Sequence, residues 1–487
     1  MEKDLLDQKK IRIEKLEKLK ELGINPYPYS FTRTHRISEI REKPDEMVGV
    51  DGIAIAGRLV GKRGHGKTIF ADIMDETGKI QLYFRKDRLE EKLFEIVNLI
   101  DIGDFIGVVG EIFKTGTGEL TVLVLGLEFL SKSLYPLPEK WHGLKDKETR
   151  YRKRYLDFIM NKDVKETFVM RAKIVGKMRE ILGKKGFIEV ETPVLQPLYG
   201  GAFAKPFKTY YNVLDREYFL RISDELYLKR LIIGGMGKVY EICKDFRNEG
   251  IDRLHNPEFT MMEAYQSYAD YSDMLELTEE IITGIAQSVR GSLKIEFQGK
   301  SIDFSRPWKR ISFYDAIKSY AGIGLSKLTE DEVYNFAKEQ GIEIDKNAGR
   351  GKILDEVFSE MVEPNLIQPT FVLDYPVDIS PLAKRHRENA ALVERFEPFI
   401  AGMEIGNAFS ELNDPFDQRE RFEEQRRMKE KGKGEIQELD EDFLSAMEYG
   451  MPPTGGLGIG VDRLIMLLTD RPSIREVIVF PQLKSKE

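Results

Sequence analysis

Residues 240–268 contain side chains that could together bind a phosphorylated ligand with a flat ring. Polarity alternates on both sides of a polar loop from Gly250 to Pro257, which predicts a β-hairpin with a long tip. An arginine can grip a phosphate through two hydrogen bonds, an aromatic ring can stack on a base, and carboxylates attract a cation. Because side chains alternate between the faces of a strand, one face should carry Glu241, Asp245, Arg247 and Glu249 on the first strand, and Phe259, Glu263 and Tyr265 on the second.

A solvated sheet face with ion pairs would explain any one of these residues. It explains the whole set less well, because each buried charge without a partner loses its hydration. We therefore interpret the hairpin as part of a ligand site, and its loop adds Arg253, His255 and Asn256.

A second group of carboxylates surrounds the dipeptide Ala401–Gly402. A two-residue turn there would place Phe399 opposite Glu404, and Glu397 opposite Gly406. Glu397 and Glu404 would then be diagonal neighbours on one face. Two carboxylates this close repel each other unless a cation lies between them or they share a proton, and hard oxygen ligands suit Mg²⁺.

Three further positions of this segment have the opposite parity from Glu404, namely Asn407, Phe409 and Glu411. Their side chains reach the same site only if Gly406 lies in a β-bulge, because a bulge adds one residue to one strand and changes the parity beyond it. A shared site therefore requires this bulge.

Residues 452–468 lead from a strand into a helix through a run of glycines, Gly455, Gly456, Gly458 and Gly460. Glycines let a nucleotide lie close to the backbone, and Arg463 would present a fixed positive charge to phosphate. The run lacks the third glycine of the dinucleotide fingerprint. The string GKRGHGKT at 61–68 satisfies the phosphate-loop pattern, but a strand, a turn and a strand follow it instead of a helix, so we reject that match.

The elements around these groups fall into two parts, and together they predict an α+β protein. Short β-rich runs at 50–61, 67–74, 79–85, 104–114 and 119–130, with a helical run at 87–100, match a five-stranded OB-fold barrel over 49–132. A turn at 75–78 would place Phe70 and Gln81 on one face, where a ring and an amide suit single-stranded RNA. A core position for Phe70 is an equally good interpretation.

Outside the barrel, the sequence predicts an N-terminal helical extension at 1–48, a linker at 133–150 rich in proline and polar residues, and a larger domain at 151–487. The larger domain should contain helices at 151–162, 165–184 and 271–290, an extended strand within 186–195, and a helical insertion around 310–363. Glu225 should lie near the start of a helix, and Gly200–Gly201 would permit a close backbone approach to a ligand.

Composition limits the class of protein. A length of 487 residues needs more than one hydrophobic core, and no run is apolar enough to cross a membrane. The single cysteine, Cys243, excludes an intramolecular disulfide and a cysteine-rich zinc site, and we expect a cytoplasmic protein. A net charge of −8 argues against a generally basic nucleic-acid binder, although local basic patches can still hold RNA.

The strings GFIEVETP, FRNEGIDRLHNPEFTMMEAY and GLGIGVDR, in that order behind an OB-like domain, resemble the three motifs of the class II aminoacyl-tRNA synthetases. GNAFSELND, HNPEFTMMEAY and SPLAK resemble the lysyl branch of that family. The resemblance implies an antiparallel six-stranded sheet flanked by helices and an ATP- and Mg²⁺-dependent lysine–tRNA ligase. Its expected partners are ATP, L-lysine, tRNA(Lys) and a second copy of the chain, with the strand at 186–195 near the twofold axis.

The resemblance also assigns roles residue by residue. It implies that Arg247 and Arg463 are catalytic and that Glu397 and Glu404 hold the metal. The implied ATP-binding set is Arg247, Glu249, His255, Asn256, Phe259, Glu404 and Arg463. The implied lysine-binding set is Gly201, Glu225, Glu263, Tyr265, Asn407, Phe409 and Glu411, with Glu411 and Tyr265 at the ε-ammonium. On the barrel, Arg58, Phe70 and Gln81 are the implied anticodon contacts, which favours the functional interpretation of Phe70.

Two positions depart from the family pattern. Ala408 stands where the family usually has glycine, so its methyl group could narrow the pocket, and Leu254 stands where bacterial members often have arginine. Arg253 could replace that missing charge. Two alternative functions are lysylation of a protein, which the anticodon-binding domain disfavours, and non-catalytic RNA binding, which the carboxylate pair Glu397 and Glu404 disfavours.

Overall fold

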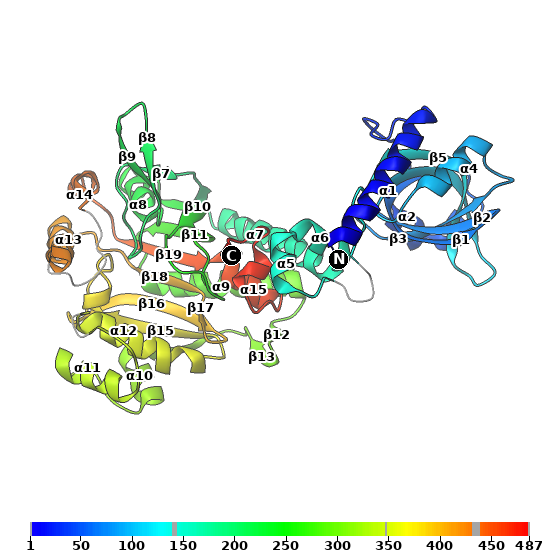
Figure 1. Ribbon diagram of the computed structural model, residues 1–487. Coiled ribbons are helices and arrows are strands. Elements are labelled where there is room, and N and C mark those ends of the chain that lie inside the picture. Colours follow the sequence, from blue (N-terminus) through cyan, green and yellow to red (C-terminus); the bar gives the residue numbers. More distant parts are fainter. Residues whose placement is uncertain (1, 139–143, 346–347, 431–438, 486–487) are drawn as a thin grey trace. The chain divides into compact units, whose positions relative to one another are not determined.

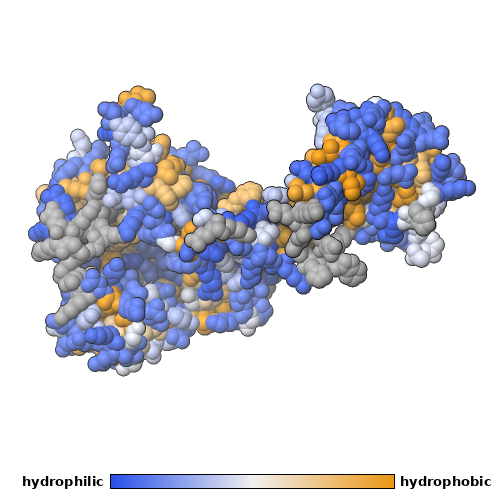
Figure 2. Space-filling view, in the orientation of Figure 1, coloured by the Kyte–Doolittle hydropathy of each residue, from blue (hydrophilic) through white to orange (hydrophobic). Residues whose placement is uncertain are grey.

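The computed structural model describes residues 2–138, 144–345, 348–430 and 439–485 (Figure 1). The chain forms two compact units, residues 1–143 and residues 144–487. On the face drawn in Figure 2, hydrophilic side chains cover most of each unit and hydrophobic ones form small separate patches. Within the described ranges, no helix is long and apolar enough to cross a membrane.

The first unit is built on a closed five-stranded barrel with the strand order β1-β2-β3-β5-β4. Its strands are β1 (Ile53–His65), β2 (Thr68–Met74), β3 (Lys79–Arg85), β4 (Phe105–Lys114) and β5 (Leu120–Ser131). Its helices are α1 (Glu2–Glu21), α2 (Ile37–Glu42), α3 (Pro44–Met47) and α4 (Glu91–Leu99), with α4 between β3 and β4. The predicted OB-fold is therefore confirmed, and the string at 61–68 lies in the β1–β2 hairpin of the barrel.

The second unit is organised around a nine-stranded sheet. Eight of its strands follow one path, β14-β15-β16-β18-β19-β11-β10-β6, and β17 pairs with β16. These strands are β6 (Ile188–Glu189), β10 (Lys238–Phe246), β11 (Glu258–Ser267), β14 (Lys309–Ser312), β15 (Thr370–Pro376), β16 (Leu392–Ile400), β17 (Met403–Glu404), β18 (Gly406–Ser410) and β19 (Thr454–Gly460). From β15 to β10 every neighbouring pair on the path is antiparallel, as expected for six strands, whereas the short strands β14 and β6 add parallel pairs at the two edges.

Helices cover the two faces of this sheet differently (Figure 1). The hydrophobic core on one face contains side chains from α7 (Lys162–Lys184), α9 (Tyr271–Arg290) and α15 (Val461–Leu468). A separate core joins α10 (Phe313–Ala321), α11 (Glu330–Glu339) and α12 (Arg350–Met361) to β15 and β16. Even-numbered residues of β11, such as Met262 and Ala264, pack into the first core, so the odd-numbered residues face the other side.

Smaller elements complete the second unit. Its other helices are α5 (Lys147–Arg152), α6 (Arg154–Met160), α8 (Glu225–Ile233), α13 (Pro415–Glu430), α14 (Glu441–Glu448) and α16 (Ile474–Val477), with 3₁₀ turns at Glu363–Asn365 and Val377–Ile379. Two small sheets are formed by β7 (Leu195–Gln196), β8 (Lys208–Tyr211) and β9 (Arg216–Leu220), and by β12 (Lys294–Phe297) and β13 (Lys300–Asp303). Glu225 is the first residue of α8, as predicted.

Candidate active site

A cavity of about 500 Å³ lies on the sheet face opposite the core of α7, α9 and α15. The residues of the second unit that the resemblance assigned to ATP, lysine and metal all line it, whereas Glu241, Asp245 and Arg253, which the hairpin pattern also suggested for the ligand site, do not. The lining includes Gly201, Glu225, Arg247, Glu249, His255, Asn256, Phe259, Glu263, Tyr265, Glu397, Glu404, Asn407, Phe409, Glu411 and Arg463. The cavity therefore brings together basic, acidic and aromatic groups from segments more than 200 residues apart in the chain.

The hairpin of β10 and β11 has the predicted pairing of faces. Glu241 lies opposite Glu263, and Asp245 lies opposite Phe259. Arg247 follows the end of β10, and its guanidinium lies 5.0 Å from the centre of the Phe259 ring. Because both side chains line the cavity, a nucleotide there could contact a ring and a guanidinium together.

The turn at Ala401–Gly402 is also present, with positive φ angles of 57° and 76°. Phe399 lies opposite Glu404 as predicted, but Phe396 lies opposite Ala408. The second strand therefore contains one residue more than β16 between these pairs, which is the bulge that the sequence required.

The bulge overturns the predicted pairing of Glu397 with Gly406, because that register would place Phe396 opposite Asn407. It brings Asn407, Phe409 and Glu411 to the cavity that Glu404 also lines. It turns Ala408 into the core on the other face, where the side chain is fully buried, so its methyl group does not narrow the cavity.

One end of the cavity is dominated by buried carboxylates. Tyr265 donates its hydroxyl to Glu263 Oε2 at 2.9 Å, and the Ser223 hydroxyl donates to Glu263 Oε1 at 3.3 Å. Burial and then the neighbouring Asp245 raise the pKa of Glu263 to about 8. Burial also raises the pKa of Glu411 well above its usual range.

Lys229 is a residue of this end that sequence reasoning missed. Its side chain is fully buried; Nζ lies 2.6 Å from Glu225 Oε1 and is also ion-paired with Glu411 Oε2. Burial lowers the pKa of Lys229, but the two carboxylates raise it by more, so the ammonium stays charged. The signal in the sequence was a lysine four residues after Glu225 on one helix, a spacing that places both on one face.

Glycines shape the backbone around this end. A Cβ atom at Gly456 would lie 1.9 Å from Glu411 Oε1, and one at Gly406 would lie 2.4 Å from the carbonyl oxygen of Gly458. Gly201 has a φ angle of 88°, a conformation that other residues adopt only under strain. The β-bulge and the position of the Glu411 carboxylate therefore depend on glycine at these positions.

The other end of the cavity combines carboxylates with arginine and histidine. Glu397 accepts hydrogen bonds from Tyr375 at 2.7 Å and Arg395 at 2.5 Å, and burial raises its pKa to about 7. Arg463 is ion-paired with Glu404 at 3.0 Å and contacts His255 Nε2 at 3.1 Å. The lining also contains three carboxylates that the sequence did not single out, those of Asp355 in α12, Glu363 and Asp462 in α15.

This set of donors fits a magnesium ion. Glu404 is partly exposed to the cavity, and the carboxylate oxygens of Glu397 and Glu404 keep lone pairs beyond the hydrogen bonds they accept. Mg²⁺ prefers one or two carboxylates together with phosphate and water oxygens.

Two candidates have structural partners as well as a place in the lining. Asn256 is buried, donates to the carbonyl of Glu258 at 2.5 Å and accepts from the amide of Gln482 at 3.3 Å. His255 Nδ1 lies 2.8 Å from Asp252 Oδ2. Both side chains thus help to fix the loop between β10 and β11.

The three candidates on the barrel lie on the sheet formed by β1, β2 and β3. Phe70 is half-buried and stacks on Tyr83 with 4.5 Å between ring centres, and Gln81 lies opposite Asp72, so Phe70 and Gln81 share a face as predicted. Gln81 is buried, and its amide oxygen accepts from Thr121 at 3.0 Å. Arg58 donates to the carbonyl of Gly103 and lies 4.2 Å from the centre of the Phe105 ring.

Known proteins resemble the chain over almost its entire length. Residues 146–484 match the family described as tRNA synthetases class II (D, K and N), and residues 53–130 match the OB-fold nucleic acid binding domain. A lysine–tRNA ligase of Carboxydothermus hydrogenoformans is 53% identical over 98% of this chain and 98% of its own. Those of Syntrophomonas wolfei and Moorella thermoacetica are each 52% identical, over 100% and 98% of this chain and 98% of each relative.

The half-buried carboxylate of Glu363 gives a prediction about stability. Burial raises its pKa from 4.5 to about 7, so the folded state favours the protonated form. Wild-type stability should therefore fall as pH rises from 4.5 through 7, by about 3 kcal/mol at most from this group. Glu363→Gln removes the charge, so its stability relative to wild type should be greater at pH 8 than at pH 5.

Chemical unfolding of both proteins at the two pH values, in buffer free of divalent metal, measures this difference. Glu360→Gln neutralises an exposed carboxylate near the end of α12, three residues before Glu363, and should produce no such pH dependence. An equal difference between Glu363→Gln and wild type at pH 5 and pH 8 would contradict the prediction.

Proposed function

The chain belongs to the lysine–tRNA ligases, class II tRNA synthetases that join lysine to tRNA with the use of ATP, and from this we propose which end of its cavity binds lysine and which end binds ATP. The observation that carries the proposal is that one cavity holds a buried carboxylate end and an end with arginine, histidine and an aromatic ring. The first end suits the two ammonium groups of lysine, and the second suits the nucleotide.

The reaction has two steps. The carboxylate of lysine attacks the α-phosphate of ATP to form lysyl-adenylate and pyrophosphate, and a ribose hydroxyl at the 3′ end of the tRNA then displaces AMP and takes the lysyl group. The attacking carboxylate is already ionised, so the first step needs no general base. Catalysis then rests on alignment and on stabilising the negative charge that grows around phosphorus.

Residues at the nucleotide end act on phosphate and base. Arg247 is placed to hold the α-phosphate, and Phe259, which lies beside it, stacks on the adenine. Arg463 and His255, which contact each other, bind the triphosphate, with Glu249 and Asn256 around them. Glu397 and Glu404 hold Mg²⁺, which screens the negative charge of the triphosphate.

Residues at the carboxylate end select lysine. Lys229 occupies Glu411 Oε2, and Glu411 Oε1 receives no hydrogen bond from any described residue, so we assign Oε1 to the ε-ammonium of the substrate. Tyr265 and Phe409 line the path of its side chain. Glu263, Glu225 and the backbone at Gly201 hold the α-ammonium, and Asn407 lies near the carboxylate.

This arrangement accounts for specificity. A neutral amino acid of similar size would leave Glu411 Oε1 buried without a cation, which costs on the order of several kcal/mol. Aspartate would bring a further negative charge to an end that already carries several carboxylates. Both effects favour lysine over its neutral and acidic competitors.

The barrel binds the anticodon of tRNA(Lys) in this proposal. Phe70 offers a ring, Gln81 an amide and Arg58 a positive charge on neighbouring strands, which suits single-stranded bases. Activity in the cytoplasm follows, because tRNA is charged where it is used in protein synthesis.

We also propose a homodimer that forms along the segment of residues 188–198. This segment contains a two-residue edge strand, β6, and four exposed apolar side chains, Ile188, Val194, Leu195 and Leu198. Apolar side chains that gather on one exposed segment favour contact with another protein surface.

Amino-acid-dependent exchange of labelled pyrophosphate into ATP tests the assignment of the cavity. Wild type should catalyse exchange with lysine alone, and Glu411→Gln should reduce kcat/KM for lysine at least about hundredfold, because it removes the charge facing the ε-ammonium. Glu394→Gln is a matched control, since Glu394 is buried on the neighbouring strand β16 but bonds to Arg387 and Ser410 outside the cavity lining. Exchange with aspartate or asparagine, or an unaltered kcat/KM in Glu411→Gln, would overturn the assignment.

The anticodon assignment predicts that Phe70→Ala raises KM for tRNA(Lys) by about tenfold or more, because stacking on a base contributes about 1–3 kcal/mol. Pyrophosphate exchange with lysine should stay at the wild-type rate, since it uses the other unit and no tRNA. Tyr29→Ala, which removes a fully exposed aromatic side chain outside the strands, serves as the control for the tRNA measurement. An unchanged KM for tRNA in Phe70→Ala would remove Phe70 from the anticodon contacts.

A further inference from the structure

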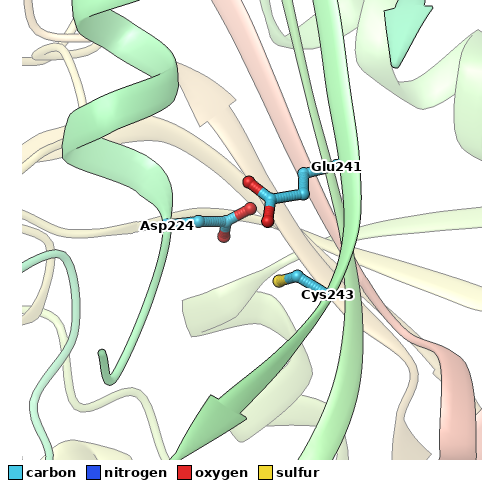
Figure 3. Close-up of side chains that lie close together, drawn as sticks. All are labelled: Asp224, Glu241 and Cys243. Atoms are coloured by element: carbon cyan, nitrogen blue, oxygen red, sulfur yellow. The ribbon is translucent and has the colours of Figure 1, made fainter. Parts of the chain in front are cut away.

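A second acidic cluster lies behind the lysine end of the cavity. Asp224 immediately precedes α8, and its carboxylate points toward the side chains of Glu241 and Cys243 on β10 (Figure 3). Asp245 of the same strand and Glu263 of β11 complete the group. Glu263 also lines the cavity, whereas Asp224 and Asp245 do not, so Glu263 forms the wall between the cluster and the substrate.

The oxygens of this cluster lack donors. Asp224 and Asp245 are fully buried, and within the described parts of the chain no N–H or hydroxyl group donates to either oxygen of Asp224 or to Oδ2 of Asp245, while Asp224 and Glu263 lie close enough to share a proton. Burial and the negative charge of Glu263 raise the pKa of Asp224. A buried carboxylate without a donor costs several kcal/mol, so this group needs a positive charge or protons.

The positively charged side chains of the neighbouring elements form ion pairs mainly with other carboxylates. Arg221 binds Glu241 at 2.8 Å and reaches only Oδ1 of Asp245, at 3.4 Å. Lys229 is held by two other carboxylates, those of Glu225 and Glu411.

Burial raises the pKa of Asp245 to about 6, and the positive charge of Arg247 opposes part of this rise. Its guanidinium faces the ring of Phe259 at the nucleotide end of the cavity. In the residues that the structure describes, no ion pair joins a lysine or arginine to Asp224.

The geometry allows one ion to be shared. Asp224, Asp245 and Glu263 each offer an oxygen, and these atoms all lie within 4.8 Å of one another. Two oxygens on opposite sides of a calcium ion lie about twice the calcium–oxygen distance of about 2.4 Å apart, which matches this separation. Small rotations of the three side chains would bring the oxygens close enough for a smaller ion.

Glu241 and Cys243 are less suited as ligands. Oε1 of Glu241 is already ion-paired with Arg221, and Oε2 accepts from the amide and hydroxyl of Thr192. Glu263 differs because, among the described residues, its two oxygens accept only from neutral hydroxyl groups, so its charge has no cation. Burial raises the pKa of the Cys243 thiol, which therefore stays protonated beside Asp245, at 3.9 Å. The remaining ligands are all carboxylate oxygens, which favour Mg²⁺, Mn²⁺ or Ca²⁺ over zinc.

We propose that Asp224, Asp245 and Glu263 bind one divalent cation of the oxygen-preferring class. This site is separate from the magnesium site assigned to Glu397 and Glu404, because three strand spacings, roughly 14 Å, separate β16 from β11 in the sheet. The cation fixes the carboxylate of Glu263 from behind, so that its cavity side remains available to a substrate ammonium.

Counting bound Mn²⁺ tests the site. The full chain, stripped of metal and without ATP, is dialysed against Mn²⁺, and bound metal is measured by elemental analysis and electron paramagnetic resonance. Wild type and Glu404→Gln should each retain the ion of the new site. Asp224→Asn and Asp245→Asn should each bind one Mn²⁺ fewer than wild type, because an amide replaces a charged ligand without changing the shape of the side chain.

Thermal unfolding gives an independent measurement on the same proteins. Saturating Mn²⁺ should raise Tm in Glu404→Gln, because only the folded chain assembles the three ligands, and the increase should be absent in the double variant with Asp224→Asn. Binding of the same number of Mn²⁺ ions by wild type and Asp224→Asn would overturn the proposal. Loss of all bound Mn²⁺ in Glu404→Gln would also overturn the proposal, and this result does not depend on whether the aspartate variants fold.

If the carboxylates share protons and bind no metal, the stability measurements should give a different result. Asp224→Asn would then be more stable than wild type at alkaline pH in metal-free buffer, and Mn²⁺ would change the Tm of neither protein. That result would also overturn the proposal.

Discussion

The catalytic unit depends on keeping several carboxylates in a place that water does not reach. Glu225, Glu263 and Glu411 are all buried at one end of a single cavity, and a buried carboxylate is tolerated only with donors or cations around it. Lys229 supplies one such cation and Tyr265 one such donor. In the proposed function, the charge that remains unmatched gives this end its affinity for a substrate with two ammonium groups, so the cost of burial and the choice of lysine would have the same origin.

The backbone satisfies a second condition, which is that the carboxylates must point to one side of the sheet. A regular strand after the Ala401–Gly402 turn would send Glu404 and Glu411 to opposite faces, and the bulge after Glu404 corrects this. Glycine is needed at Gly406 and Gly456, because a side chain there would meet a carbonyl oxygen or the carboxylate of Glu411. These glycines therefore serve the placement of charge, and the same strands present the opposite face to the hydrophobic core.

Local periodicity explains why much of this could be predicted. The shared face of Glu241 and Glu263 follows from the alternation in two strands of one hairpin, although their direct pairing was not predicted, and the need for a bulge follows from the parity of Glu404 and Glu411. An extended strand within 186–195 was expected, but the parallel pairing of the short edge strands β6 and β14 was not predictable in this way, because two to four residues carry no period. Residues such as Asp355 and Lys229 reach the site through the packing of helices, which a pattern within one segment does not contain.

The most direct test of the account is a crystal structure of the protein with a non-hydrolysable lysyl-adenylate analogue. We expect the ε-ammonium of the ligand within hydrogen-bonding distance of Glu411 Oε1, the α-ammonium against Glu263, and the adenine stacked on Phe259. An analogue bound with its ε-ammonium away from Glu411, or with Glu411 still paired only to Lys229, would contradict the claim that the unmatched charge of the buried carboxylates selects lysine.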